Sequence, residues 1–233
     1  MKAHLAKALY VEAAHRNPAG GPRQQRLHGH SYQIELLAEG EVDPALGWVV
    51  DYADLKAVFH PLYRQLDHAY LNLLPGLEQD ATLPALERWI MARLGAPPEW
   101  FAGVRVSILG DLEYRPVRLP EDSARQLPER IRFTFEAAQS LPQLPEGHPC
   151  RRVHGHSYIV EAGVAELDQL GPCLKTLYDE LDHQFLNDVP GLSHATCERI
   201  CQWIWRRMEQ AGFQPTVIQV QETPSARCLI RGL

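Results

Sequence analysis

The phrase HGHSY occurs twice in this 233-residue chain, once in each half. The two copies lie within longer similar stretches, RLHGHSYQIEL (Arg26–Leu36) and RVHGHSYIVEA (Arg152–Ala162). Other phrases recur in the same order: VEAAHR with FEAAQS, LDHAYLN with LDHQFLN, PGL, and AT followed by WI. So many matched blocks in one order exceed chance, and the chain is therefore a tandem duplication with halves of about 110–120 residues.

The boundary between the halves is predicted in the stretch RLPEDSARQLPER (Arg118–Arg130). This stretch is rich in proline and charged residues, which is typical of a linker. We therefore predict two domains, 1–118 and 131–233, each of a size that can bury its own core.

Both halves predict the same order of secondary structure. A first strand covers Ala8–Arg16 or Ile131–Ser140, and a second begins at each HGHSY phrase, where apolar and polar residues then alternate. Helical segments and two closing strands follow in each half, which gives ββααββ twice and an α+β fold. The helices are expected in Tyr52–Asn72, Leu83–Gly95 and Cys197–Gly212, and the closing strands around Val104–Leu109 and Thr216–Thr223.

Composition and charge exclude several classes of protein. The formal net charge is −6 and no basic run is present, which argues against a nucleic-acid-binding surface. No stretch approaches the ~18–20 apolar residues of a membrane span, and the N-terminal sequence lacks the apolar core of a signal peptide. The five cysteines form no regular framework and favour a reducing compartment. We therefore expect a cytoplasmic protein with no nucleic-acid or membrane partner.

Three histidines of the first half are candidates for a metal site. His28 and His30 are two residues apart at the start of a strand, so both imidazoles point to one face of the sheet. His15 ends the preceding strand, which can pair with this one. Three imidazoles match the protein ligands of a catalytic zinc whose fourth position is open. Structural histidines that only form hydrogen bonds remain the alternative.

Two Asp-His pairs, Asp67–His68 and Asp182–His183, recur with the same flanking residues. A carboxylate can orient an imidazole for general acid–base chemistry, although helix capping or packing also accounts for such a pair. Cys150 precedes the second HGHSY phrase, where a thiolate beside a cation can act as base or nucleophile. Glu222 ends a strand and can bind a guanidine-like edge through two hydrogen bonds, or can be an exposed acid.

These phrases together resemble the 6-pyruvoyltetrahydropterin synthase family, including its bacterial relative 6-carboxytetrahydropterin synthase of the queuosine pathway. The resemblance rests on AAHR at a strand end, a loop cysteine, HGHSY, GWVVDYADLK, LDH-x-x-LN, AT before a helix and a final strand that ends ET. It implies a tunnelling fold built as stacked rings of three domains, with active sites between subunits. It also implies zinc on three histidines, a catalytic cysteine, an Asp-His pair and a glutamate that anchors the pterin.

Neither half keeps the whole set of residues that this resemblance implies. The first half keeps the zinc ligands and one Asp-His pair: His15, His28, His30, Asp67 and His68. Its cysteine position is Gln24, and its glutamate position falls at Gly110 or Asp111.

The second half keeps the cysteine, the Asp-His pair, the glutamate and two zinc positions: Cys150, Asp182, His183, Glu222, His154 and His156. Its first zinc position is Gln139, a poor ligand for zinc, so any metal site there is expected to be weaker. We therefore expect about one tightly bound zinc per chain.

The resemblance implies a zinc-dependent lyase that acts on a pterin, dihydroneopterin triphosphate, with 6-carboxytetrahydropterin synthase favoured over the pyruvoyl-forming reaction. The alternative is a catalytically degenerate pterin- or purine-binding protein or scaffold, and a cyclohydrolase or pterin aldolase ranks third. Because the losses in the two halves are complementary, we expect a composite pocket. It would join the zinc of the first half to Glu222 and to Cys150 or Asp182–His183. Ring closure predicts a homotrimer with six pseudo-equivalent domains.

Overall fold

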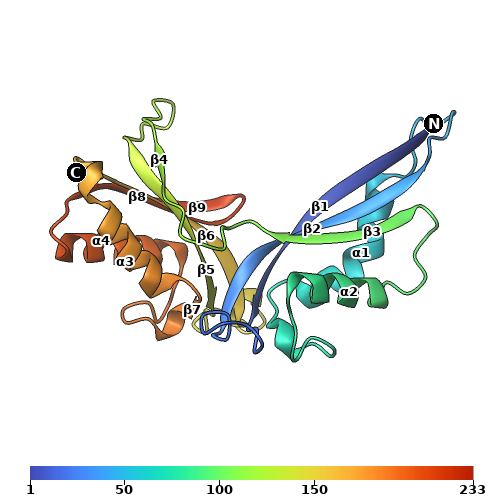
Figure 1. Ribbon diagram of the computed structural model, residues 1–233, viewed down its shortest axis with the longest axis horizontal. Coiled ribbons are helices and arrows are strands. Elements are labelled where there is room, and N and C mark those ends of the chain that lie inside the picture. Colours follow the sequence, from blue (N-terminus) through green and yellow to red (C-terminus); the bar gives the residue numbers. More distant parts are fainter. Residues whose placement is uncertain (233) are drawn as a thin grey trace.

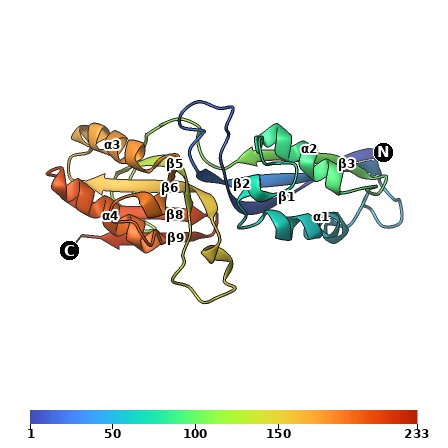
Figure 2. The same ribbon diagram turned by 90° about the horizontal axis from the view of Figure 1, so that it is seen from below.

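The computed structural model describes residues 1–232 and shows two α+β halves that meet end to end in a V (Figure 1). Each half has a sheet with its helices packed on one face, and the open ends of the V carry the two chain termini (Figure 1). The prediction of an α+β fold is confirmed. Seen from below, the two helical layers lie on either side of the junction (Figure 2).

The first half forms a three-stranded antiparallel sheet in the order β1-β2-β3. Along α1, apolar residues recur at helical spacing and bury one face of the helix against the sheet; Asp51 caps its start by accepting from the backbone N–H of Ala53 at 2.7 Å. The elements are β1 (Lys2–His15), β2 (His28–Glu41), α1 (Tyr52–Leu66), α2 (Leu83–Arg93) and β3 (Phe101–Ile108).

The second half forms a larger sheet in the order β4-β5-β6-β8-β9, to which the short β7 adds by pairing with β5. A separate apolar core lies between this sheet and its helices, with Ile200, Ile204 and Met208 of α4 fully buried. The elements are β4 (Val117–Leu119), β5 (Arg130–Gln139), β6 (His154–Val164), α3 (Gly171–Leu181), β7 (Gln184–Phe185), α4 (Cys197–Gln210), β8 (Pro215–Thr223) and β9 (Ala226–Arg231).

The two halves differ in their closing strands. The sequence predicted two for each half, but within residues 1–232 the sheet of the first half closes with β3 alone. After β3 the chain crosses to the other half, where Tyr114 packs on Phe133 and Tyr178 and β4 pairs with β5. Apolar contacts with the second core therefore hold the segment that would otherwise continue the first sheet. None of the helices in residues 1–232 has the length and apolar character that a membrane span requires.

The halves touch where β2 and β6 cross, and the glycine of each HGHSY phrase makes that crossing possible. A Cβ atom on Gly29 would lie 2.4 Å from the Cα of Gly155, and a Cβ on Gly155 would lie 2.2 Å from the Cα of Gly29. The next residues lock the contact, because Ser31 and Ser157 each donate a backbone N–H to the other's Oγ at 3.1 Å. The repeated phrase therefore supplies both a histidine face and a close backbone contact.

We predict that Gly155→Ala lowers the free energy of unfolding by about 1–3 kcal/mol, because the added methyl group forces two backbones apart. Urea denaturation followed by circular dichroism measures this. Gly171→Ala is the matched control, since its Cβ would meet nothing within 4 Å. An unchanged denaturation midpoint for Gly155→Ala would show that the crossing does not need the glycine.

Candidate functional site

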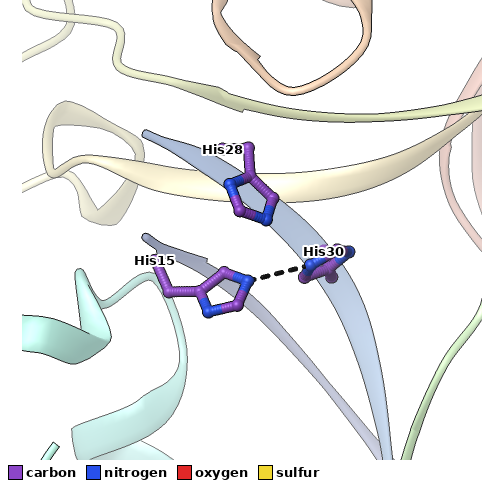
Figure 3. Close-up of side chains that lie close together, drawn as sticks. All are labelled: His15, His28 and His30. Carbon is purple, nitrogen blue, oxygen red and sulfur yellow. Dashed lines mark hydrogen bonds between the residues drawn. The ribbon is translucent and has the colours of Figure 1, made fainter. Parts of the chain in front are cut away.

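The three histidines of the first half converge where β1 ends and β2 begins (Figure 3). His15 pairs with His28 in the strand register, and His30 lies on the same face two residues further along β2. The ring centroids of His15 lie 4.4 Å from His28 and 5.0 Å from His30, and Nε2 of His15 is 3.0 Å from Nε2 of His30. All three side chains are buried.

Hydrogen bonds to Nδ1 leave the opposite nitrogens of two of these rings free as ligands. Nδ1 of His28 donates to the carbonyl oxygen of Arg26 at 2.8 Å, and Nδ1 of His30 donates to Oε2 of Glu136 at 2.6 Å. Such outer contacts fix the ring tautomer and orientation of metal-binding histidines. Nε2 of His15 and Nε2 of His30 lie within hydrogen-bond distance, and a cation bound to both nitrogens would replace that hydrogen bond. The residues therefore fit a zinc-type centre, although they do not by themselves fix which metal binds.

The charge state of these rings also suits a metal. Burial, together with the neighbouring histidines, lowers the pKa of His28 to about 3. Burial and His183 lower the pKa of His30 to about 3 as well. Burial, followed by the neighbouring histidines, takes the pKa of His15 well below its usual value. At neutral pH the three rings are thus unprotonated, and protons compete little with a metal ion.

The Asp-His pair of the second half lies against this first-half cluster. The His183 ring stacks on the His28 ring with centroids 4.2 Å apart, and Nδ1 of His183 donates to Oδ2 of Asp182 at 2.5 Å. Arg23, on the loop between β1 and β2, forms an ion pair with the same oxygen of Asp182. We use the name first pocket for this cluster of contacting side chains, without implying a cavity: the three histidines, the Asp182–His183 pair and Arg23.

Two residues that the family resemblance singled out do not add to the first pocket. Gln24, at the cysteine position, is exposed on its loop. Gly110, at the glutamate position, packs against the second half, where a Cβ atom would lie 1.7 Å from Oε1 of Glu136. No side chain fits at Gly110 while Glu136 keeps its contact with His30.

The second pocket contains the corresponding residues of the second half and the Asp-His pair of the first. Its residues are Gln139, Cys150, His154, His156, Glu222, Asp67 and His68. The composite pocket expected from the sequence is thus present in part. Within one chain, Asp182–His183 joins the metal cluster of the first half, whereas Glu222 and Cys150 lie in the second pocket.

An amide group in the second pocket takes the place that the His15 imidazole has in the first. Nε2 of Gln139 donates to Oε1 of Glu222 at 2.7 Å and approaches Nε2 of His154 at 3.4 Å. His156 lies between two carboxylates, with Nδ1 at 2.8 Å from Glu12 and Nε2 at 3.1 Å from Glu222. Burial acts to lower the pKa of His156, but hydrogen bonds to these two carboxylates raise it to about 9. In the second pocket, the positive charge beside Glu222 therefore comes from a proton on His156, and the amide of Gln139 supplies a hydrogen-bond donor.

Cys150 completes a thiol–imidazole–carboxylate chain across the two halves. Its Sγ lies 3.5 Å from Nε2 of His68, and Nδ1 of His68 donates to Oδ2 of Asp67 at 3.0 Å. Burial, then the charges of Glu222 and Asp67, raises the pKa of the Cys150 thiol, so the thiol is the resting form at neutral pH.

Both Asp-His pairs are held in an uncommon backbone conformation. His68 has φ 55° and His183 has φ 54°, values at which residues other than glycine are rare and which are often found at functional sites. Each pair is tied to the first strand of its own half: the backbone N–H of His68 donates to the carbonyl of Glu12 at 2.8 Å, and that of His183 donates to Glu136 at 2.6 Å. This turn directs each imidazole toward the other half.

Sequence reasoning missed the two buried carboxylates that cross between the halves. Glu12 belongs to the first half and accepts from His156 of the second, while Glu136 belongs to the second and accepts from His30 of the first. The serine hydroxyls of Ser31 and Ser157 also donate to these carboxylates, at 2.5 and 2.7 Å. The repeat itself contained the signal, because VEAAHR and FEAAQS both keep the glutamate and both HGHSY phrases keep the serine.

A family model described as 6-pyruvoyl tetrahydropterin synthase matches the chain twice, over residues 4–106 and 130–232. The chain belongs to this family. The predicted resemblance is confirmed, and with it the tandem tunnelling fold and an enzyme of the tetrahydropterin synthase type. The metal that binds, the substrate and the pathway are not fixed by this membership.

The chain is also similar to individual proteins and to a solved structure. A 6-carboxy-5,6,7,8-tetrahydropterin synthase of Synechocystis is 38% identical over 99 residues, with 34% of this chain and 73% of that protein covered. A dihydroneopterin monophosphate aldolase of Pyrococcus furiosus is 28% identical over 121 residues, with 52% and 91% covered. The solved structure of Caenorhabditis elegans 6-pyruvoyl tetrahydropterin synthase aligns with a TM-score of 0.41 at 21% identity, covering 46% of this chain and 89% of that one.

We predict that purified protein retains about one zinc per chain and that His28→Ala removes it, because a three-imidazole set is present only in the first pocket among the described residues. Elemental analysis after dialysis measures the zinc content. His154→Ala is the matched control, since it changes the corresponding residue of the second pocket and should leave the zinc in place. Near two zinc ions per parent chain, or full zinc in His28→Ala, would contradict this assignment.

Proposed function

We propose that this chain is a zinc-dependent pterin-processing lyase that acts on dihydroneopterin triphosphate, most similar in activity to 6-carboxytetrahydropterin synthase. The proposal rests on one observation: a possible metal site of one half lies beside a possible acid–base group of the other. The metal site has three unprotonated imidazoles, and the acid–base group is an imidazole oriented by an aspartate. Family membership and the Synechocystis relative support the pterin substrate class. We extend the proposal to the queuosine pathway and a cytoplasmic location, which free cysteines also suit.

In this proposal, His15, His28 and His30 hold zinc, which would polarise the hydroxyl groups of the substrate side chain and lower their pKa values. The chain supplies the proton transfer. Asp182 accepts from Nδ1 of His183, which fixes the tautomer and leaves Nε2 to take up and return a proton. Burial of the pair, with Asp182 at 1% exposed, keeps water from replacing the imidazole as the proton acceptor.

His183 and Arg23 together keep Asp182 negatively charged in the first pocket. Burial acts to raise the pKa of Asp182, but the hydrogen bond from His183 and the charge of Arg23 bring it below its ordinary value. Asp182 therefore stays a carboxylate, which is the form that orients His183 and stabilises a positive charge on it during proton transfer.

Glu222 does not contact the three first-half histidines within one chain, so we assign to it the recognition of a pterin bound in the second pocket. Its Oε1 already accepts from Gln139 and contacts His156, and its side chain is partly exposed. A carboxylate in this setting can accept two hydrogen bonds from the N3–H and 2-amino group of a pterin. Cys150 and the Asp67–His68 pair lie in the same pocket and, while no metal ion is bound to them, would transfer protons for a ligand bound there.

A second candidate function is a catalytically degenerate pterin- or purine-binding protein. One observation favours it: in the pocket that keeps the thiol and the glutamate, Gln139 replaces one of the three candidate metal ligands and donates instead to Glu222. Under this reading, zinc in the first pocket stabilises the contact between the halves, and the second pocket only binds.

We also propose a homotrimer in which each chain places one domain, 1–118 or 131–233, in each of two stacked rings. The strands β1 and β3 are open edges of the first sheet, and β9 is an open edge of the second, so edge pairing between chains would satisfy their backbone groups. Light scattering at micromolar concentration should give three times the mass of one chain, and a monomer would contradict the arrangement.

To test the function, zinc-loaded protein is incubated with dihydroneopterin triphosphate, and products are followed by ultraviolet absorbance and mass spectrometry. We expect a 6-carboxy product with release of acetaldehyde. His183→Gln should abolish turnover while zinc is retained, because it removes the proton carrier and leaves the metal ligands. The matched variant His68→Gln changes the equivalent histidine of the second pocket and reports whether that pocket also takes part.

Pterin binding separates the two candidate functions. Glu222→Ala should weaken binding by on the order of 1–3 kcal/mol, the loss of a charge-assisted contact, without loss of zinc. Glu121→Ala, at an exposed position, is the control. Tight pterin binding with no product from the parent protein would refute the lyase and select the binding protein. Unchanged binding by Glu222→Ala would refute the assignment of Glu222.

A further inference from the structure

The second pocket brings one sulfur and two imidazole nitrogens together from both halves of the chain. Cys150, His154 and His68 each offer a ligand atom, and these three atoms lie within 4.8 Å of one another. Sγ of Cys150 is 3.5 Å from Nε2 of His68, and the His68 and His154 rings have centroids 4.6 Å apart. One residue comes from the first half and two come from the second.

The two imidazoles are already oriented as ligands. Nδ1 of His68 donates to Asp67 at 3.0 Å, and Nδ1 of His154 donates to the carbonyl oxygen of Arg152 at 2.8 Å. Each bond fixes the tautomer in which Nε2 carries a lone pair, as the outer-shell partners of metal-binding histidines do. The lone pair of His68 faces the Cys150 thiol at 3.5 Å and that of His154 faces the Gln139 amide at 3.4 Å, two long contacts that a metal ion would replace. The proton-free nitrogens and the thiol sulfur therefore face a common point.

A competing ligand set in the same pocket is less available. His154, His156 and Glu222 also lie within 4.8 Å of one another. However, both ring nitrogens of His156 face carboxylates, with Nδ1 2.8 Å from Oε2 of Glu12 and Nε2 3.1 Å from Oε1 of Glu222, so neither nitrogen faces an open position. The amide of Gln139 further occupies Glu222. A cation that enters the pocket therefore finds its accessible ligand atoms on Cys150, His68 and His154.

We propose that His68, Cys150 and His154 form a second metal site, which takes a thiophilic divalent cation such as zinc and bridges the two halves of the chain. One thiolate and two imidazoles are typical zinc ligands, and three protein ligands leave a fourth position open to water or a small ligand. As the Sγ–metal bond forms, the thiol proton passes to solvent. The site differs from the first pocket in ligand type, because only this one contains sulfur.

This proposal does not rest on the proposed lyase activity, since it concerns metal binding by residues of the second pocket alone. It adds to the one zinc that the first pocket retains, because the second site fills when further metal is supplied. Thiol coordination gives it a spectroscopic signature that three imidazoles cannot produce, namely charge transfer from sulfur to an open-shell metal.

The test is a titration of cobalt(II) into zinc-retaining protein kept reduced by a phosphine. We expect a near-ultraviolet thiolate-to-cobalt charge-transfer band that saturates at one cobalt per chain. Cys150→Ser should abolish the band, and His68→Ala and His154→Ala should each weaken cobalt binding by about tenfold or more. Circular dichroism verifies that each variant is folded.

Two controls make the result specific. Cys173→Ser removes another half-buried thiol that belongs to none of the metal-ligand clusters in residues 1–232, and it should keep the band. His28→Ala changes the first pocket and should keep the band as well. Cobalt that binds without the band, a band that survives Cys150→Ser, or unchanged affinity in both histidine variants would overturn the proposal.

Discussion

The contact between the backbones of Gly29 and Gly155 is the constraint on which both pockets depend. Because neither residue has a Cβ atom, β2 and β6 approach closely enough for Ser31 and Ser157 to exchange hydrogen bonds. That separation in turn lets each buried glutamate reach a histidine of the other half. The crossing therefore fixes the positions of the residues that each half contributes to the pocket of the other.

The same scaffold produces two different electrostatic environments. In the first pocket, burial and mutual repulsion keep three imidazoles neutral, which is the state that binds a cation. In the second, Gln139 replaces one imidazole and Glu222 approaches His156, so that a proton on His156 and an amide N–H supply the positive charge. One difference at a strand end, His15 in one half and Gln139 in the other, accompanies this change from three neighbouring imidazoles to an amide beside a histidine paired with carboxylates.

Much of the architecture could be predicted from the sequence because the repeat is explicit. The duplication, the strand with HGHSY, and the convergence of His15, His28 and His30 all follow from matched blocks and a strand period of two. A composite pocket was expected from complementary losses, with Cys150 or Asp182–His183 as the group joining the first-half histidines, and the structure brings Asp182–His183 beside them. The sequence did not predict that Cys150 and Glu222 lie in the second pocket, apart from the three first-half histidines. It shows which residues each half keeps, but not which pocket the strands of each half face. The pairing of β4 with the second sheet was likewise missed, since it depends on the packing of Tyr114 against the second core.

The crossed carboxylates Glu12 and Glu136 have a consequence for how such a gene can change. A substitution at Glu136 alters the surroundings of His30, 106 residues away in the chain, and so its effect is felt in a copy that did not mutate. The same holds for Glu12, which contacts His156 of the second half. At the crossing, neither copy of the repeat can therefore change without altering the hydrogen bonds of the other.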